Sequence, residues 1–480
     1  MKRAKVMTAL VCAALGLFSV ASGLDPPEKM WEKTYPDYYA FYWIGNVSDE
    51  DYIVACHPTS YWTSESVCRL SSSGEIIWAA GDPNLYWHAA LDIEFLQDGN
   101  MIVAGVSKPL ETGENGLLLY KLSASGELLW SMLYNYDGYN ESARSVCTLP
   151  DGGFAVCGRV YGEGLSLGQA WILRTDANGD TLWTDVWGTH TINYACGVEY
   201  DQENDWIAVL AYGRSDSLQV TSPHMLYYTL DGEYLFGTSY PETPGRNPSD
   251  LCRAADGGYT FVSEYGQGYT PIMSHTDELG ELLWFIHIYG FAYGDAYGID
   301  RTVLDDGYLV SGFAVDSNWV GEGPRSEGAR LYRFDGDGNE LWDITEGSWG
   351  DEFRAALQLP QGGYIAAGSS AGDGYLVRYA PETGIEEGSG LPGGSALLGP
   401  VAPNPSSSVF QVRVDLPEAM EVRLDVFDTS GRRVELLVDG LLQSGAHEFS
   451  WDASGLPSGC YLVRLSGIGA SETVRCVLIR

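Results

Sequence analysis

The chain has 480 residues, of which 45% are hydrophobic and 19% charged, with 59 Gly and 31 Tyr. This composition is typical of a globular, turn-rich protein that is long enough for more than one domain. The formal net charge is −38, and a surface this acidic repels phosphate backbones and anionic lipid. The composition therefore argues against nucleic-acid binding.

The N-terminus has the pattern of a targeting segment. Three basic residues open the chain, an apolar run follows over residues 6–20, and residues 21–23 are small. This order predicts a secretory signal peptide over residues 1–23, too short and wrongly flanked for a transmembrane anchor. The competing interpretation is a lipoprotein anchored through Cys12, but Val11 precedes this cysteine where a small residue is expected.

After the signal, an aromatic residue recurs about every 50 residues. Six of its seven copies follow a glycine four positions earlier, as in the phrase Gly126-Glu-Leu-Leu-Trp130. Self-similarity of this length predicts a solenoid, propeller or array, because each repeat is too small to bury its own apolar face. The seven positions are Trp31, Trp78, Trp130, Trp183, Phe236, Trp284 and Trp342.

A second repeated position lies between the members of the first. Its clearest copies follow Asp-Gly-Gly or Gln-Gly-Gly, which provide the positive φ of a tight hairpin turn. In the repeat from Trp130 to Trp183 we expect strands over residues 129–134, 143–149, 154–160 and 170–174, and four short antiparallel strands make a propeller blade. The second set comprises Tyr52, Met101, Phe154, Trp206, Tyr259, Tyr308 and Tyr364.

The two ends of the repeat region complement each other. The chain opens on a lone Trp-led strand at residues 30–31, and the last repeat closes at residues 375–378, one strand short. We interpret this as ring closure, in which the first strand completes the last blade and covers an edge that would otherwise invite aggregation. The prediction is an all-β protein with a seven-bladed β-propeller over residues 24–379.

The pattern changes after the last repeat. Residues 380–397 are rich in Gly, Ser, Pro and Glu and predict a flexible linker. A compact all-β unit is expected over residues 398–480. Its candidate strands are 409–414, 421–427, 433–438, 447–451, 461–465 and 473–479.

This C-terminal unit resembles the type-A sorting domain of the type IX secretion system. The resemblance is carried by an ordered set of motifs that includes Pro403, Asn404, Pro405, Asp428, Gly431, Arg432, Gly459 and Tyr461. It implies an immunoglobulin-like sandwich, the secretion machinery as partner, and a secreted or outer-cell-surface location in a Gram-negative-type bacterium. The domain would afterwards be removed or used for surface attachment, and the sequence leaves both routes open. The repeats before it are similar to bacterial propeller repeats with Trp and Asp-Gly-Gly-Tyr motifs.

Eight cysteines follow the predicted signal, and three pairs lie at equal distances from hairpin centres. These pairs are Cys56 with Cys68, Cys147 with Cys157, and Cys460 with Cys476. Such spacing makes a bridge geometrically possible in an exported protein, and small buried thiols are the alternative. Cys196 and Cys252 have no evident partner.

Catalytic and metal motifs are weak. The string from Gly164 to Gly168 matches a serine-hydrolase elbow around Ser166, but it lies between two strands of one blade rather than in a strand-to-helix turn. We therefore predict no catalytic and no cofactor-binding residues. Asp335, Asp337 and Asn339 alternate like the start of a calcium loop; a hairpin turn is the favoured interpretation and weak calcium binding the alternative.

Aromatic residues outside the repeated positions gather in the first blade. Among these, Trp62 and Trp87 are candidate ligand contacts, because exposed loop aromatics line carbohydrate and protein grooves. We expect a non-catalytic binding or scaffold protein. The alternative is an extracellular hydrolase or lyase that acts on polysaccharide or peptide through its propeller loops. An enzyme should carry acidic or His side chains with perturbed pKa values at one mouth of the central channel, and a scaffold a smooth or aromatic face.

Overall fold

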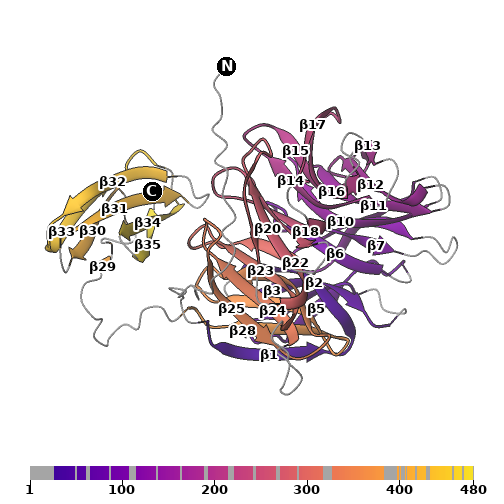
Figure 1. Cartoon of the computed structure of the whole chain (residues 1–480), viewed down its shortest axis with the longest axis horizontal. Coiled ribbons are helices and arrows are strands. Elements are labelled where there is room, and N and C mark those ends of the chain that lie inside the picture. Colours follow the sequence, from indigo (N-terminus) through magenta and orange to yellow (C-terminus); the bar gives the residue numbers. More distant parts are fainter. Residues whose placement is uncertain are drawn as a thin grey trace, which may run out of the picture. The chain divides into compact units, whose positions relative to one another are not determined.

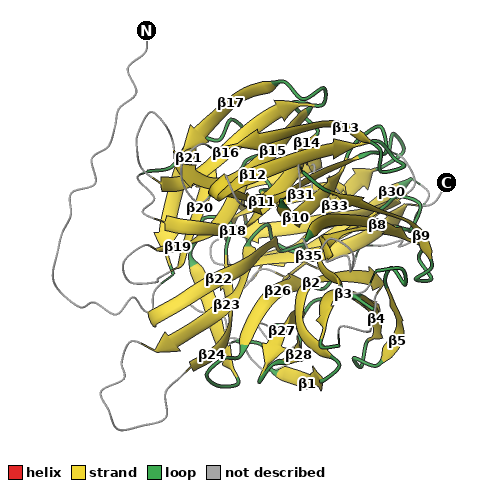
Figure 2. Ribbon diagram, turned by 90° about the vertical axis from the view of Figure 1, so that its right-hand side faces the viewer, coloured by secondary structure: helices red, strands yellow, loops and turns green. Residues whose placement is uncertain are grey.

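The computed structural model of the chain is all-β in the part it describes, as the strands in Figure 2 show. Within that part, no helix is long and apolar enough to cross a membrane. The predicted signal peptide lies outside it. The described residues are 26–48, 51–60, 65–85, 88–107, 115–136, 139–162, 165–188, 193–214, 221–241, 245–265, 271–288, 291–316, 327–382, 397–398, 401, 406, 408–416, 419–428, 433–456, 459–467 and 470–478.

Seven four-stranded antiparallel sheets form the blades of a propeller, as the repeats predict. The first four complete blades are β2 (Tyr38–Ser48), β3 (Asp51–Pro58), β4 (Val67–Ser71), β5 (Ile76–Ala80); β6 (His88–Phe95), β7 (Met101–Ser107), β8 (Gly116–Leu122), β9 (Leu128–Tyr134); β10 (Asn140–Thr148), β11 (Phe154–Gly162), β12 (Leu165–Thr175), β13 (Thr181–Trp187); and β14 (Tyr194–Asp201), β15 (Trp206–Arg214), β16 (Thr221–Thr229), β17 (Tyr234–Ser239).

The other three blades complete the ring. They are β18 (Gly245–Arg253), β19 (Tyr259–Tyr265), β20 (Pro271–Thr276), β21 (Leu282–His287); β22 (Phe291–Arg301), β23 (Tyr308–Asp316), β24 (Glu327–Phe334), β25 (Glu340–Glu346); and β26 (Glu352–Gln358), β27 (Tyr364–Ser370), β28 (Asp373–Tyr379), β1 (Lys29–Tyr35). The first strand of each repeat is innermost, and each innermost strand contacts the innermost strand of the next blade all the way around.

The ring is closed by the first strand of the chain. β1 pairs antiparallel with β28, with Trp31 opposite Arg378 and Tyr35 opposite Gly374. Figure 1 shows the indigo β1 alongside the orange β28. The predicted closure is thus confirmed, and the edge of β28 is covered by the most distant segment of the propeller.

The repeated Gly and Trp join neighbouring blades. The ring of Trp78 lies against Gly126 in the turn of the next blade, where an added Cβ would meet the ring at 2.9 Å. Gly126 has a φ of 86°, a conformation that glycine adopts without strain. Trp31, Trp130, Trp183 and Trp284 contact the glycine of the following blade in the same way. At these five positions the repeated aromatic residue therefore packs between neighbouring blades.

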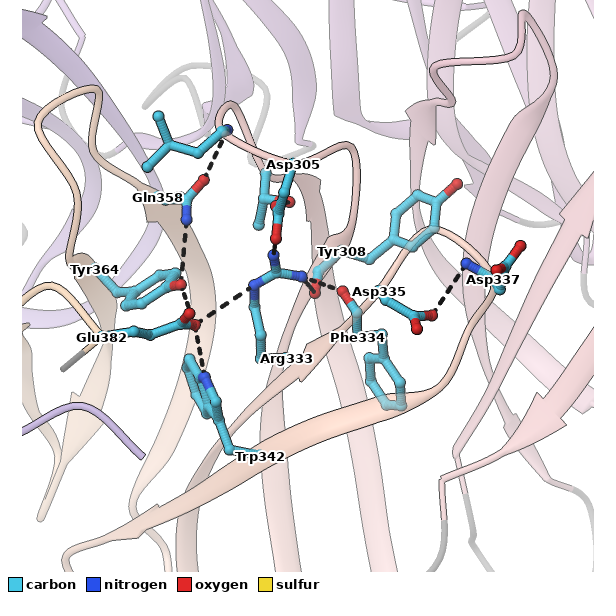
Figure 3. A network of polar contacts seen from close by, with 12 residues as sticks. Asp305, Tyr308, Arg333, Phe334, Asp335, Asp337, Trp342, Gln358, Tyr364 and Glu382 are labelled. Carbon is cyan, nitrogen blue, oxygen red and sulfur yellow. Dashed lines mark hydrogen bonds and ion pairs between the residues drawn. The ribbon is translucent and has the colours of Figure 1, made fainter. Parts of the chain in front are cut away.

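At the closing blade, the repeated Trp342 contacts the segment just after β28 instead of a turn glycine. Glu382 accepts a hydrogen bond from Trp342 Nε1 at 2.7 Å and another from the Tyr364 hydroxyl. The same carboxylate lies 3.8 Å from Nε of the fully buried Arg333, whose guanidinium also pairs with Asp305. Figure 3 shows these side chains converging. Glu382 follows the predicted propeller boundary at residue 379, yet it bonds to two neighbouring blades.

The C-terminal unit begins at Ile385, and its described residues form seven strands. Two sheets share one core, in which the rings of Phe410 and Trp451 stack with their centroids 4.9 Å apart. This arrangement fits the expected immunoglobulin-like sandwich. All six expected strands occur. They are β30 (Val409–Leu416), β31 (Met420–Asp428), β32 (Arg433–Leu442), β33 (Gly445–Asp452), β34 (Gly459–Gly467) and β35 (Ala470–Leu478), with the short β29 (Leu397–Leu398) in addition.

Candidate functional site

Each innermost strand of the propeller contains a β-bulge. The register with the second strand shifts by one residue at the same place in all seven blades. A bulge leaves one residue unpaired and changes the direction of its side chain. The seven extra residues are Tyr42, Leu91, Arg144, Cys196, Ser249, Tyr297 and Arg354.

All seven bulge residues line one cavity of about 930 Å³ in the central channel. Residues of all seven innermost strands contribute to its wall. A concave site of this size, with a few convergent polar groups among apolar ones, is the usual form of a ligand site. The channel is therefore the candidate functional site.

An arginine in contact with two tyrosines forms one side of the channel wall. The guanidinium of Arg354 lies 4.7 Å from the ring centroid of Tyr42 and 5.0 Å from that of Tyr297. Its Nε donates to Glu352 Oε1 at 2.7 Å. The cation–π contacts with the two rings and the ion pair with Glu352 fix this side chain. The wall therefore presents a rigid polar and aromatic surface from three blades.

Two aspartates of the channel wall hold adjacent blades together. Asp92 accepts hydrogen bonds from the backbone N–H of Val146 at 2.8 Å and of Ile93 at 2.9 Å. Asp250 accepts from the backbone N–H of Ile299 and of Leu251, both at 2.9 Å. In each case the first donor belongs to the next blade. These two carboxylates therefore have a structural task.

Further carboxylates line the channel three residues after the bulge in alternate blades. Burial raises the pKa of Glu94 to about 7, with a contribution from Asp92. Burial also raises the pKa of Glu199 to about 8, and the nearby Glu94 adds to the shift. Asp300 occupies the same position in a third blade; its side chain reaches solvent, yet desolvation at this position in the channel also raises its pKa, to about 6. In the sequence, the only trace of these three carboxylates is their equivalent position in alternate repeats, which matches no catalytic motif.

The predicted ligand residues Trp62 and Trp87 lie outside the described residues. Of the other aromatic residues in that blade, Tyr42 and Trp43 line the channel, Tyr38 is buried and Tyr39 is exposed. Two aromatic residues of strand β2 thus reach the central channel, and ligand contact by Trp62 and Trp87 stays a prediction.

The candidate calcium residues form a turn. Asp335 Oδ1 accepts the backbone N–H of Asp337 at 3.0 Å and of Asn339 at 2.8 Å. Among the described residues, no group of three or more His, Cys, Asp or Glu has the geometry to hold a metal ion. Calcium binding by these three residues stays a prediction.

The sorting motif is described in part. Asp428 belongs to β31 and Gly459 to β34, while Tyr461 is buried with its ring 5.4 Å from that of Trp451. The remaining motif residues lie outside the described part of the chain: Pro403, Asn404, Pro405, Gly431 and Arg432.

None of the three predicted cysteine pairs is directly opposite in its ladder. Cys68 lies opposite Val54, Cys157 opposite Ser145, and Cys476 opposite Tyr461. The cysteines of the first pair are nevertheless in contact, with 3.8 Å between the sulfur atoms of Cys56 and Cys68.

Comparison with solved structures finds distant resemblances. The extracellular domain of a hybrid two-component system from B. thetaiotaomicron is 12% identical, with a TM-score of 0.45 over 95% of this chain; the chain spans 60% of that structure. A fungal alcohol oxidase in complex with copper is 13% identical, with a TM-score of 0.47 over 94% of this chain and 100% of the other. PorZ, a surface component of the type IX secretion system of Porphyromonas gingivalis, is 13% identical, with a TM-score of 0.33 over 90% of this chain and 64% of the other. None of the curated proteins matches the chain.

The family comparison concerns the C-terminal unit. Residues 400–480 match the secretion system C-terminal sorting domain. This match and the two-sheet structure confirm the resemblance predicted from the motifs. The chain is therefore a secreted or cell-surface β-propeller protein that carries a C-terminal sorting domain of the type IX secretion system.

Proposed function

We propose that this protein is a non-catalytic binding or scaffold protein of the cell surface, and that its ligand occupies the central channel of the propeller. The observation that carries the proposal is the channel cavity of about 930 Å³, into which every blade contributes one bulge residue. The bulges make the wall by backbone geometry, so the blades can keep their packing while the channel residues differ.

The ligand class that suits this wall is a polysaccharide or a protein segment. Tyr42 and Tyr297 offer aromatic surface, and Arg354 and Ser249 offer hydrogen-bond donors. Aromatic rings with a small number of placed polar groups are the usual means of recognising such ligands. The formal net charge of −38 argues against nucleic acid.

A screen of the mature full-length protein against polysaccharide and peptide arrays tests this proposal. It is run with and without calcium, and it records both bound ligand and released product. We expect binding without product. Absence of binding to every array member would contradict the proposal for these two ligand classes.

A matched pair of variants then locates the ligand. Leu91→Trp adds bulk at a bulge in the channel, whereas Leu129→Trp makes the same change on an outer strand where the side chain is 49% exposed. We expect affinity to fall by at least about tenfold, equal to about 1.4 kcal/mol, for the channel variant only. Equal affinity of both variants would place the ligand elsewhere.

The second candidate is an extracellular hydrolase or lyase, and Glu94 and Glu199 favour it. A general acid at neutral pH needs a raised pKa, and burial raises these two pKa values to about 7 and about 8. In that case the array screen releases product. Glu199→Gln should then lower the rate by about 100-fold or more while ligand is still bound, and the exposed Glu233→Gln should leave the rate unchanged.

A further inference from the structure

We propose that Cys56 and Cys68 are joined by a disulfide bond in the exported protein. The two residues lie on β3 and β4, which are neighbouring strands of one blade. Cys68 is opposite Val54, and the backbone N–H of Cys56 donates to Ser66 at 2.8 Å, so the cysteines are diagonal neighbours across the ladder. Residues two steps apart on a strand point to the same face.

The sulfur atoms are already in contact. Their separation is 3.8 Å, and both residues are fully buried. A disulfide needs about 2.05 Å, so the sulfur atoms must approach by less than about 2 Å. Among the cysteines whose side chains are described, no second pair makes such a sulfur–sulfur contact. Geometry therefore favours Cys56–Cys68 over Cys147–Cys157, and the side chain of Cys460 in the third pair lies outside the description.

The surroundings favour a structural bond over a reactive thiol. Burial raises the pKa of Cys56 well above its ordinary value. A buried thiol with little thiolate is inert as a nucleophile. Cys56 and Cys68 belong to the core cluster that joins this blade to the closing blade, together with Phe41 and Leu376. A bond here would tie β3 to β4 beside the point where the ring closes.

Export brings the chain into a compartment that contains an oxidant for the thiols. The sorting domain directs the chain out of the cell, through compartments in which disulfides form and persist. We assign the oxidant to the class of cell-envelope thiol oxidases that carry a reactive disulfide. One cysteine thiolate attacks that disulfide to form a mixed disulfide, and the second thiolate displaces the carrier. The two cysteines lose two protons and two electrons, and the carrier leaves as a dithiol. Because the folded site is closed to solvent, the exchange takes place before the blade packs.

Thiol counting on the exported full-length protein tests the proposal without any variant. The protein is unfolded in guanidinium and alkylated with N-ethylmaleimide, with or without prior reduction, and its intact mass is measured. We expect two fewer adducts in the unreduced sample, and a proteolytic fragment that links the peptides of Cys56 and Cys68. Equal adduct numbers in the two samples would overturn the proposal.

A pair of matched variants assigns the bond independently. Cys56→Ser should abolish the difference of two adducts, whereas Cys196→Ser, at a buried cysteine of the channel, should retain it. A difference of two that survives in Cys56→Ser means that other cysteines are bonded, and it also overturns the proposal.

Discussion

A contact between a glycine of one blade and a tryptophan of the preceding blade recurs around the propeller. Gly126 combines a φ of 86° with a contact to Trp78 that leaves no room for a Cβ. Gly99 has a φ of 80° but no atom within 4 Å of the corresponding position. Replacing Gly99 by Ala thus introduces backbone strain alone, whereas replacing Gly126 by Ala introduces both backbone strain and a steric clash.

We predict that Gly99→Ala lowers the free energy of unfolding by about 1 kcal/mol, the cost of a left-handed conformation for an L residue. Gly126→Ala should lower it by about 2–4 kcal/mol, because the new methyl group also displaces the indole ring. Urea denaturation of both variants measures the difference. Equal losses would mean that the Gly–Trp contact does not constrain the blades.

The channel carboxylates give the stability a pH dependence. The pKa of Glu199 is raised to about 8 in the folded protein by burial, with Glu94 as the next cause. An unfolded chain restores the ordinary value of about 4.3. Between these two pH values Glu199 is protonated in the folded state and ionised in the unfolded state. The contribution of protonated Glu199 to the free energy of unfolding is therefore complete below pH 4 and is lost as the pH rises to 8.

We therefore expect the melting temperature to fall between pH 5 and pH 9, and to fall less in Glu199→Gln. A loss of about 1 kcal/mol corresponds to about 2 °C in a large domain. Calorimetry across this pH range, with Glu233→Gln as an exposed control, provides the measurement. If the melting temperatures of Glu199→Gln and Glu233→Gln depend on pH in the same way, Glu199 is not the group responsible.

At the scale of elements, both ends of the propeller segment take part in its closure. β1 adds the outer strand to the last blade, and Glu382 bonds to Trp342 and Tyr364 just beyond β28. Without its carboxylate, buried donors would lack a partner, at a cost of about 1–3 kcal/mol each.

Glu382→Ala should therefore lower the free energy of unfolding by about 2–4 kcal/mol. The matched control is Glu75→Ala, which removes an ion pair with Lys33 from a glutamate that is 73% exposed. That change should cost less than about 1 kcal/mol, as is usual for surface pairs. Thermal melts of the two variants decide, and similar melting temperatures would show that Glu382 does not secure the ring.

At the scale of the whole molecule, the propeller and the sorting domain have separate hydrophobic cores. Trp451 is 1% exposed and packs between Phe410 and Tyr461 in the core of the sorting domain. Each unit should therefore lose or keep its structure by itself.

Trp451→Ala should destabilise the sorting domain by about 3–5 kcal/mol, because it removes the largest side chain of that core. We expect the variant to accumulate inside the cell while its propeller melts at the wild-type temperature. Fractionation and calorimetry measure the two effects. Normal export of the variant would contradict the dependence of sorting on a folded domain.

The sequence by itself determined the blade number, the ring closure and the sorting domain. This was possible because each blade is built from consecutive residues, so Trp130 and Gly126 report the same local turn in every repeat. The order of motifs around Tyr461 identified the sorting domain for the same reason, since those motifs follow one another within a single compact unit.

Only the tertiary structure decided the site. Glu94 and Glu199 stand in different blades, and they share a channel because seven inner strands meet around one axis. The bulge residues were equally hidden, because a bulge is defined by the pairing of two strands rather than by residue type. Likewise, spacing suggested three cysteine pairs, and the register placed the sulfur atoms of Cys56 and Cys68 in contact. Contacts between distant residues depend on register and ring closure, which no local pattern records.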